Sequence, residues 1–218
     1  MRLWGGPPLV RSSAQAKLYS AVPSYRETEI KLRVDDLDVL IGKLNRLGAR
    51  TNGRVFERNT LFDTPDADFR RRGRLLRLRV EAPARSPIIA AGPAGAILTS
   101  KQAAPASVAA GYKQNLESEI AVAAPQRWFA QMRALGLRPA FRYEKFRSRF
   151  RLGRLHLDLD ETPVGTFLEL EGDPRRIDRA AHALGYSRRD YIRGTYWDLY
   201  AADCRRRGKI PRAMVFGA

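Results

Sequence analysis

Residues 27–34 read Glu-Thr-Glu-Ile-Lys-Leu-Arg-Val, and charged residues alternate with uncharged ones along this segment. Side chains two residues apart lie on the same face of a β-strand, so the segment predicts a strand with one charged face and one largely apolar face. The charged face carries Glu27, Glu29, Lys31 and Arg33. Neighbouring carboxylates repel each other unless a cation lies between them. The pattern therefore indicates a site for a divalent metal and a polyanion, with the solvated face of an ordinary antiparallel sheet as the alternative.

The same alternation recurs in several later segments. Their polar stripes are Arg77 and Arg79; Thr99 and Lys101; Glu117 and Glu119; Lys145, Arg147 and Arg149; His156, Asp158 and Asp160; and Glu169 and Glu171. Most of these segments carry charges of one sign only, whereas a solvated face usually mixes uncharged polar residues and both signs. This sorting of charge favours a functional interior over a solvated surface.

The apolar stripes need cover, and amphipathic patterns predict helices at residues 36–47, 125–135, 174–184 and about 188–202. The first three end at a Leu-Gly pair, which is typical of helix C-termini. If helices cover the apolar side of the sheet, the charged side faces inward. We therefore expect an α+β fold in which an antiparallel sheet closes into a β-barrel around a charged interior, with the helices packed outside.

The net charge of +17 over 218 residues predicts a polyanionic partner. A specific nucleic-acid partner is not expected, because the sequence lacks basic aromatic runs, an RNP-type motif and a zinc pattern. The arginine-rich runs at 70–74 and 205–209 read as solvated. Cys204 is the only cysteine, so the chain has no internal disulfide and no thiolate metal cluster.

The chain length fits one domain, which we place at residues 25–203. Residues 1–24 lack a long apolar stretch and predict a flexible lead-in, not a signal peptide. Residues 82–112, rich in Ala, Pro and Gly, predict a flexible insertion around the strand that contains Lys101, and residues 204–218 predict a basic tail. No apolar run approaches ~18 residues, so we expect no membrane partner and a cytoplasmic location.

Carboxylates lie at both chain ends of the expected sheet, and they converge if the first and last strands become neighbours. Oxygen ligands suit Mg²⁺ or Mn²⁺. The candidate ligands are Glu27, Glu29 and Glu171, with Glu169 or Asp160 close by.

Basic side chains would line the rest of the interior and bind an anionic substrate. The candidates are Lys31, Arg77, Arg79, Lys101, Lys145 and Arg147, with Arg33 on the same stripe as Lys31. This set exceeds the needs of a monophosphate, whereas a triphosphate carries about four negative charges. Phosphoryl transfer needs positioning and charge neutralisation more than covalent chemistry, and no P-loop or kinase motif set occurs.

Taken in order, these motifs resemble those of the CYTH superfamily, the triphosphate tunnel metalloenzymes. The resemblance rests on Glu27-x-Glu29-x-Lys31, Leu76-Arg77-Leu78-Arg79, Leu98-Thr99-x-Lys101, Glu117-x-Glu119, Lys145-x-Arg147, Leu157-Asp158-x-Asp160 and Phe167-Leu168-Glu169-Leu170-Glu171. It implies a closed eight-stranded antiparallel barrel that forms a tunnel. It also implies that Glu27, Glu29 and Glu171 hold the metal and that the basic residues above grip the triphosphate. Glu117 or Glu119 would orient a basic residue, a second metal or a water, which gives a catalytic group of Glu27, Glu29, Lys31, Glu117 and Glu119.

Members of this superfamily share a site but not a reaction. We expect a metal-dependent triphosphatase that hydrolyses the terminal phosphate of tripolyphosphate, or of ATP or another organic triphosphate. The alternatives are a class IV adenylyl cyclase, which releases cyclic AMP and pyrophosphate from ATP, and a polyphosphate- or nucleotide-binding module without turnover. Residues 160–167 and 184–192 are most similar to bacterial class IV cyclase-like members. No Trp or Tyr adjoins Arg77 and Arg79, which disfavours a thiamine triphosphatase. A homodimer is a further expectation, because related barrels often pair.

Overall fold

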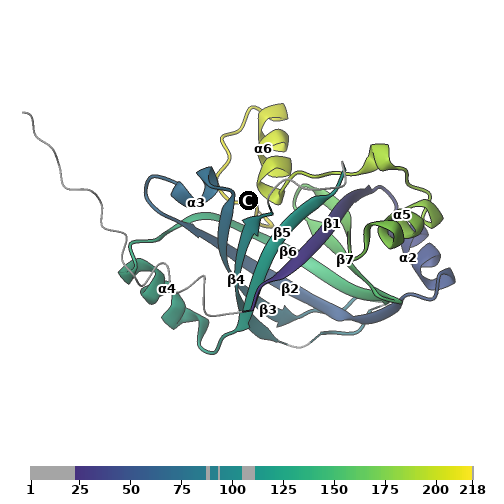
Figure 1. The fold of residues 1–218 in the computed structure, drawn as a ribbon, viewed down its shortest axis with the longest axis horizontal. Helices are drawn as coiled ribbons and strands as arrows, with labels where there is room; N and C mark the ends of the chain where they lie inside the picture. Colours follow the sequence, from purple (N-terminus) through teal and green to yellow (C-terminus); the bar gives the residue numbers. More distant parts are fainter. Residues whose placement is uncertain (1–22, 87–88, 93, 105–110, 218) are drawn as a thin grey trace, which may run out of the picture.

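The computed structural model describes residues 23–86, 89–92, 94–104 and 111–217. Within these residues, eight antiparallel strands close into a barrel in the order β1-β5-β4-β3-β2-β6-β7-β8 (Figure 1). The strands are β1 (Tyr25–Val34), β2 (Arg50–Asp63), β3 (Arg74–Pro83), β4 (Gly95–Ala103), β5 (Lys113–Ala121), β6 (Arg138–Leu152), β7 (Leu155–Thr162) and β8 (Gly165–Glu171). The expected α+β class and closed antiparallel barrel are confirmed.

The helices lie outside the barrel, as expected (Figure 1). They are α2 (Leu37–Arg46), α3 (Asp68–Arg71), α4 (Pro125–Ala134), α5 (Pro174–Ala183), the 3₁₀-helix η1 (Arg188–Asp190) and α6 (Tyr196–Arg206). Leu44 of α2 and Ile177 of α5 pack into one apolar cluster with Leu170 of β8, and all three are fully buried. Met132 of α4 packs with Leu98 in a second cluster. Because the apolar stripes pack outward against helices, the charged stripes face the barrel interior.

Strand β2 was not among the predicted strands. Its sequence alternates less clearly than the others, because Val55 and Leu61 share a stripe with Glu57 and Asn59. Such a mixed stripe resembles neither a charged face nor an apolar face, so the two-residue period is hidden. In the structure β2 pairs with both β3 and β6, and it carries Glu57 to the barrel interior.

The helix predicted at about 188–202 is instead two elements, η1 and α6. The chain between them is extended, because Ile192 exchanges backbone hydrogen bonds with Lys31 of β1. Thr195 then begins α6 with a capping box, in which its hydroxyl accepts from the Asp198 amide and the Asp198 carboxylate accepts from the Thr195 amide. Because α6 begins at this point, the residues of its first turn line the barrel cavity.

The basic tail predicted at residues 204–218 is exposed along its arginine run and then returns to the barrel wall. Arg205, Arg206 and Arg207 are exposed as predicted, but Met214 is fully buried and bridges Tyr143 of β6. Phe216 packs on Phe146, with ring centroids 5.3 Å apart. The expected lead-in at residues 1–24 falls almost wholly outside the described residues, as do parts of the expected insertion at 82–112.

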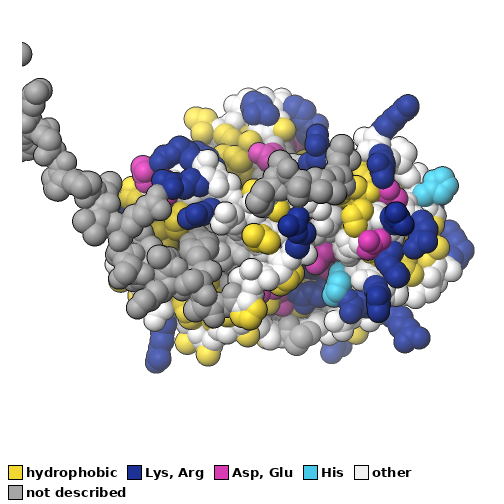
Figure 2. Space-filling view, viewed as in Figure 1, with side chains coloured by type: hydrophobic (Ala, Val, Ile, Leu, Met, Phe, Trp, Pro, Cys, Tyr) yellow, Lys and Arg dark blue, Asp and Glu magenta, His cyan; other side chains and the backbone are white. Residues whose placement is uncertain are grey.

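Within the described residues, no helix has the length and apolar character needed to span a membrane. Figure 2 shows that Lys and Arg side chains dominate the charged groups on the visible face, in keeping with the net charge of +17. These exposed cations lie outside the barrel and are separate from the interior cations.

We expect Met214→Ala to lower the free energy of unfolding by about 2–4 kcal/mol, because it leaves a cavity in the cluster around Tyr143. Ile210→Ala is the matched control in the same segment, since Ile210 is 79% exposed and should change stability by less than about 0.5 kcal/mol. Urea denaturation of both variants measures the difference. Equal, small effects would show that the C-terminal segment does not support the barrel.

Candidate active site

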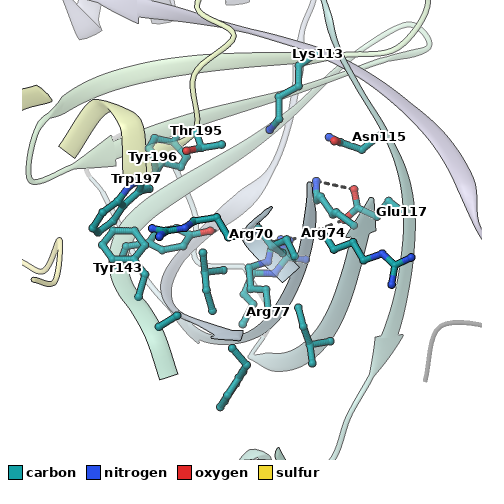
Figure 3. Close-up of a pocket in the computed structure, with 18 of the residues that line it drawn as sticks. Arg70, Arg74, Arg77, Lys113, Asn115, Glu117, Tyr143, Thr195, Tyr196 and Trp197 are labelled. Carbon is teal, nitrogen blue, oxygen red and sulfur yellow. Dashed lines mark hydrogen bonds and ion pairs between the residues drawn. The ribbon is translucent and has the colours of Figure 1, made fainter. Parts of the chain in front are cut away.

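The barrel encloses a cavity of about 1190 Å³ to which every strand contributes lining residues, and the inward charged stripes supply many of them. The predicted site residues that line it are Glu27, Glu29, Lys31, Arg77, Arg79, Lys101, Glu117, Glu119, Lys145, Arg147, Glu169 and Glu171. Arg33 and Asp160 are the two predicted residues that the structure does not bring to the cavity surface. Figure 3 shows Glu117 and Asn115 on one side of the pocket, facing Tyr143, Tyr196 and Trp197 on the other.

Closure of the barrel makes β1 and β8 neighbours, as the sequence predicted. Glu29 lies directly opposite Glu171, and Lys31 lies opposite Glu169. The Lys31–Glu169 pair is an ion pair of 2.9 Å. The Glu29–Glu171 pair places two like charges opposite each other, which destabilises a sheet unless a cation neutralises them.

Glu27, Lys101 and Glu117 form a second group of charges across β1, β4 and β5. The Lys101 ammonium lies 2.7 Å from a Glu27 oxygen and 2.6 Å from a Glu117 oxygen. Burial raises the pKa of both carboxyls, but Lys101 more than offsets this for Glu27 and lowers its pKa to about 2. Burial and the nearby Glu27 charge raise the pKa of Glu117 to about 8. Two carboxyls thus share one ammonium, and one of them keeps its proton near neutral pH.

Glu171 faces this group with no ion-pair partner among the described residues. Burial and the charge of Glu27 raise the pKa of Glu171 to about 7. Such crowding of carboxylates fits a divalent cation, which would neutralise Glu27, Glu29 and Glu171 together. In the described part of the chain no three acidic or histidine side chains are yet arranged at ligating positions, since Lys101 and Lys113 hold Glu27 and Glu29. Metal binding would have to displace these lysines.

Asp160 and Glu169 differ from the crowded carboxylates because protein cations already satisfy them. Asp160 is fully buried and accepts hydrogen bonds from Lys145 at 2.8 Å, from Arg147 at 2.7 and 2.6 Å, and from the Tyr196 hydroxyl at 2.6 Å. Glu169 pairs with Arg147 at 2.5 Å as well as with Lys31. Lys31 and Arg147 hold the pKa of Glu169 well below its ordinary value despite its burial. This geometry fits an anchoring role for both acids, which sequence reasoning placed in the metal group.

Glu57 on β2 is a further anchor that sequence reasoning missed. It is fully buried, with its oxygens 3.5 Å from Lys145 Nζ, 3.6 Å from Arg147 Nε and 3.9 Å from Arg79 Nη1. Burial opposes its ionisation, yet these cations lower its pKa well below the ordinary value. Because the stripe of β2 is mixed, nothing local in the sequence marked Glu57 as an interior residue.

Arg77 and Arg79 lie side by side on β3 and share Glu119. The distances from Glu119 Oε1 are 3.5 Å to Arg77 Nη2 and 3.3 Å to Arg79 Nη2, and Thr99 donates to the same oxygen at 2.8 Å. Although burial opposes it, these contacts lower the pKa of Glu119. The Nε of Arg77 is buried with no hydrogen-bond partner among the described residues. A buried unpartnered donor is costly, so the described contacts of Arg77 leave one of its donors unsatisfied.

Arg33 lies at the rim, where its guanidinium stacks over the Phe167 ring at 4.9 Å. It is exposed and does not line the cavity, so a role in substrate binding stays a prediction. Arg149, which shares the stripe of Lys145 and Arg147, does line the cavity and pairs with Glu81 at 2.5 Å. The two-residue alternation of β6 could have identified Arg149 as a cavity residue, because it places Arg149 on the same face as Lys145 and Arg147.

A sequence profile of the CYTH domain matches residues 25–196. Among curated proteins, none matches the sequence significantly. Three solved structures illustrate the likeness of fold. A candidate adenylate cyclase from Vibrio parahaemolyticus is 18% identical with a TM-score of 0.67, covering 81% of this chain and 98% of its own. A protein from Pyrococcus horikoshii is 20% identical with a TM-score of 0.65, covering 81% and 99%. A candidate adenylyl cyclase from Hippeastrum with a dominant triphosphatase activity is 18% identical with a TM-score of 0.53, covering 85% and 97%. At these identities the likeness shows the fold alone.

We expect Glu171→Gln to stabilise the metal-free protein above pH 7 and to change little below pH 4.5. The folded-state pKa of about 7 lies above the ordinary 4.5, so ionisation of Glu171 opposes folding, and this cost appears as the pH rises between these values. The gain should be on the order of 1–2 kcal/mol after allowance for solvent screening. Thermal melts in EDTA from pH 4.5 to 9 measure it.

Glu119→Gln is the control of opposite sign. The pKa of Glu119 is lowered, so its stabilisation is present at neutral pH and is lost on acidification. This variant should melt earlier than wild type at pH 7. If Glu171→Gln also melted at a lower temperature than wild type at pH 8.5, repulsion between Glu171 and its neighbouring carboxylates would be excluded.

Proposed function

Because this chain belongs to the CYTH family, and because its barrel encloses carboxylates and arginines in one cavity, we propose that it is a divalent-metal-dependent triphosphatase. The observation that carries the proposal is that the described interior leaves some of its charged groups without a partner of opposite charge or a hydrogen bond. Arg77 has an unpartnered buried donor, while Glu117 and Glu171 have pKa values raised to about 8 and 7. A polyanion would satisfy the arginine, and a divalent cation would relieve the crowded acids.

We place the metal at Glu27, Glu29 and Glu171, with Mg²⁺ or Mn²⁺ as the ion, because an all-oxygen set suits hard cations. When bound, the metal would supply charge neutralisation of the phosphates and polarisation of a water. Asp160 and Glu169 would not bind the metal but would position the neighbouring cations, since each acid already pairs with two of them.

The cations of the chain itself bind and orient the triphosphate. Lys31, Lys145 and Arg147 are held from behind by Asp160, Glu57 and Glu169, so their positions are set before the substrate arrives. Preorganised cations in an enclosed site stabilise the charge that develops on the phosphate oxygens without reorganising during the reaction. Hydrolysis then joins the oxygen of a water to the terminal phosphorus and breaks the bond to the bridging oxygen, and the fixed cations stabilise the leaving diphosphate.

The proposal is tested by incubating the purified protein with Mg²⁺ or Mn²⁺ and either tripolyphosphate or ATP. Orthophosphate release that EDTA abolishes is the expected result. Cyclic AMP and pyrophosphate from ATP would identify a cyclase instead. Tight binding of tripolyphosphate without any product would identify a binding module.

We expect Glu171→Gln to lower metal-dependent turnover by about 100-fold or more while the protein remains folded, because it removes a proposed ligand from a crowded group. Turnover as a function of Mg²⁺ concentration, together with circular dichroism, measures both properties. Full activity at low Mg²⁺ would contradict the metal assignment.

Asp160→Asn should behave differently, because Asp160 anchors buried cations. Leaving Lys145 and Arg147 without this partner should cost about 3–5 kcal/mol of stability. Its Mg²⁺ concentration for half-maximal activity should stay close to that of wild type. A large shift in Mg²⁺ dependence, with unchanged stability, would instead make Asp160 a metal ligand.

A further inference from the structure

One mouth of the tunnel differs in chemistry from the rest of the interior. It lies where α3, the start of β6 and the first turn of α6 meet, and we call it the aromatic mouth. It is formed by Arg70, Arg138, Phe141, Tyr143 and Trp197, all of which line the cavity. Figure 3 shows Tyr143 and Trp197 together on one side of the pocket, with Arg70 directed toward them.

Trp197 is held in place from two sides. Its ring and that of Phe141 form a T-shaped pair, with centroids 5.0 Å apart and planes at 80°. The capping box of Thr195 and Asp198 fixes the turn of α6 on which it lies. The side chain is only half-buried, so part of the indole faces the cavity. A fixed, partly exposed indole is a surface on which a planar ring can stack.

The aromatic mouth is continuous with the cations that would bind the phosphates. The Tyr143 ring stacks on Phe141 at 5.6 Å, and its hydroxyl accepts a hydrogen bond from Arg77 at 3.3 Å. Tyr196 follows toward the interior, where Lys31 Nζ lies 4.5 Å and Lys145 Nζ 5.0 Å from its ring centre. A ligand that places phosphates on these cations can therefore extend a planar group to Trp197.

The size of the cavity also exceeds what an inorganic triphosphate fills. Pockets of about 300–1,000 Å³ hold drug-sized molecules, and this cavity measures about 1190 Å³. Arg70 and Arg138 have no ion-pair partner among the described residues. Their positive charge opposes a cationic ring and favours a neutral one whose edge carries hydrogen-bond acceptors.

We propose that the aromatic mouth binds the base of a nucleoside triphosphate and that Trp197 is the residue that selects this substrate over inorganic triphosphate. The proposal rests on the proposed function, because it assigns the phosphates to the same cation array. No Trp or Tyr adjoins Arg77 and Arg79 in the sequence, but in the structure the Tyr143 hydroxyl accepts a hydrogen bond from Arg77. Trp197 is linked to Tyr143 through Phe141, which packs against both rings.

The test compares two ligands by calorimetry with Mg²⁺ present: the β,γ-imido analogue of ATP and tripolyphosphate. Trp197→Ala should weaken binding of the analogue about 10-fold more than binding of tripolyphosphate, because only the analogue has a base to stack. Trp197→Phe should restore most of the difference. In steady-state assays the ratio of kcat/KM for ATP to that for tripolyphosphate should fall about 10-fold in Trp197→Ala, mainly through KM.

Trp128→Leu on α4 is the matched control, since Trp128 packs on the outer cluster and should leave the ratio at its wild-type value. If Trp197→Ala fails to fold, Trp197→Leu keeps apolar volume and gives the same comparison. Equal losses for both ligands, or tripolyphosphate binding as tightly as the analogue to wild type, would overturn the proposal. Tighter binding of thiamine triphosphate than of ATP would also overturn it. Failure of the proposed function is distinguishable, because it would abolish turnover of every triphosphate while the binding comparison could still be made.

Discussion

The constraint on which this structure depends is that charges enclosed in a barrel must be neutralised inside it. Lys145, Glu57 and Asp160 are almost entirely shielded from solvent. Taking such groups out of water costs several kcal/mol each, and ion pairing at best repays that cost. The interior therefore contributes little net stability, and the apolar clusters between barrel and helices must hold the fold together. A chain that retains such an interior does so for what the charges bind.

The interior carboxylates divide into two kinds by their partners. Asp160, Glu57 and Glu169 are each surrounded by lysines and arginines, and the pKa values of Glu57 and Glu169 are lowered accordingly. Glu117 and Glu171 face other carboxylates, and their pKa values are raised. The first kind orients cations, whereas Glu117 shares Lys101 with Glu27 and Glu171 has no ion-pair partner among the described residues. Of the three proposed metal ligands, Glu171 alone belongs to the second kind, since Lys101 lowers the pKa of Glu27.

The charged interior of the cavity and its aromatic mouth are built from different elements of the fold. Charged stripes on the strands line its interior, and we propose that they bind the phosphates of the substrate. The aromatic mouth depends on α3 and α6, which lie outside the strand pattern. Connecting segments carry binding residues more often than the strands that position them, and for this reason we place substrate selection at the aromatic mouth. The placement of Trp197 by the Thr195 cap is one way in which a local helix start determines what a shared tunnel accepts.

The charged alternation of residues 27–34, and of the segments that repeat it, was enough to predict a closed antiparallel barrel with a charged interior. It also marked most of the charged residues that line the cavity, because the two-residue period of a strand is a local property. Strand β2 was not predicted, because one of its faces mixes the apolar Val55 and Leu61 with the charged Glu57. The anchoring of Asp160, the placement of Trp197 beside the tunnel and the burial of Met214 came only with the tertiary structure. A residue's period says which face it occupies, but its partners come from strands and helices distant in the chain, and only closure of the barrel brings them together.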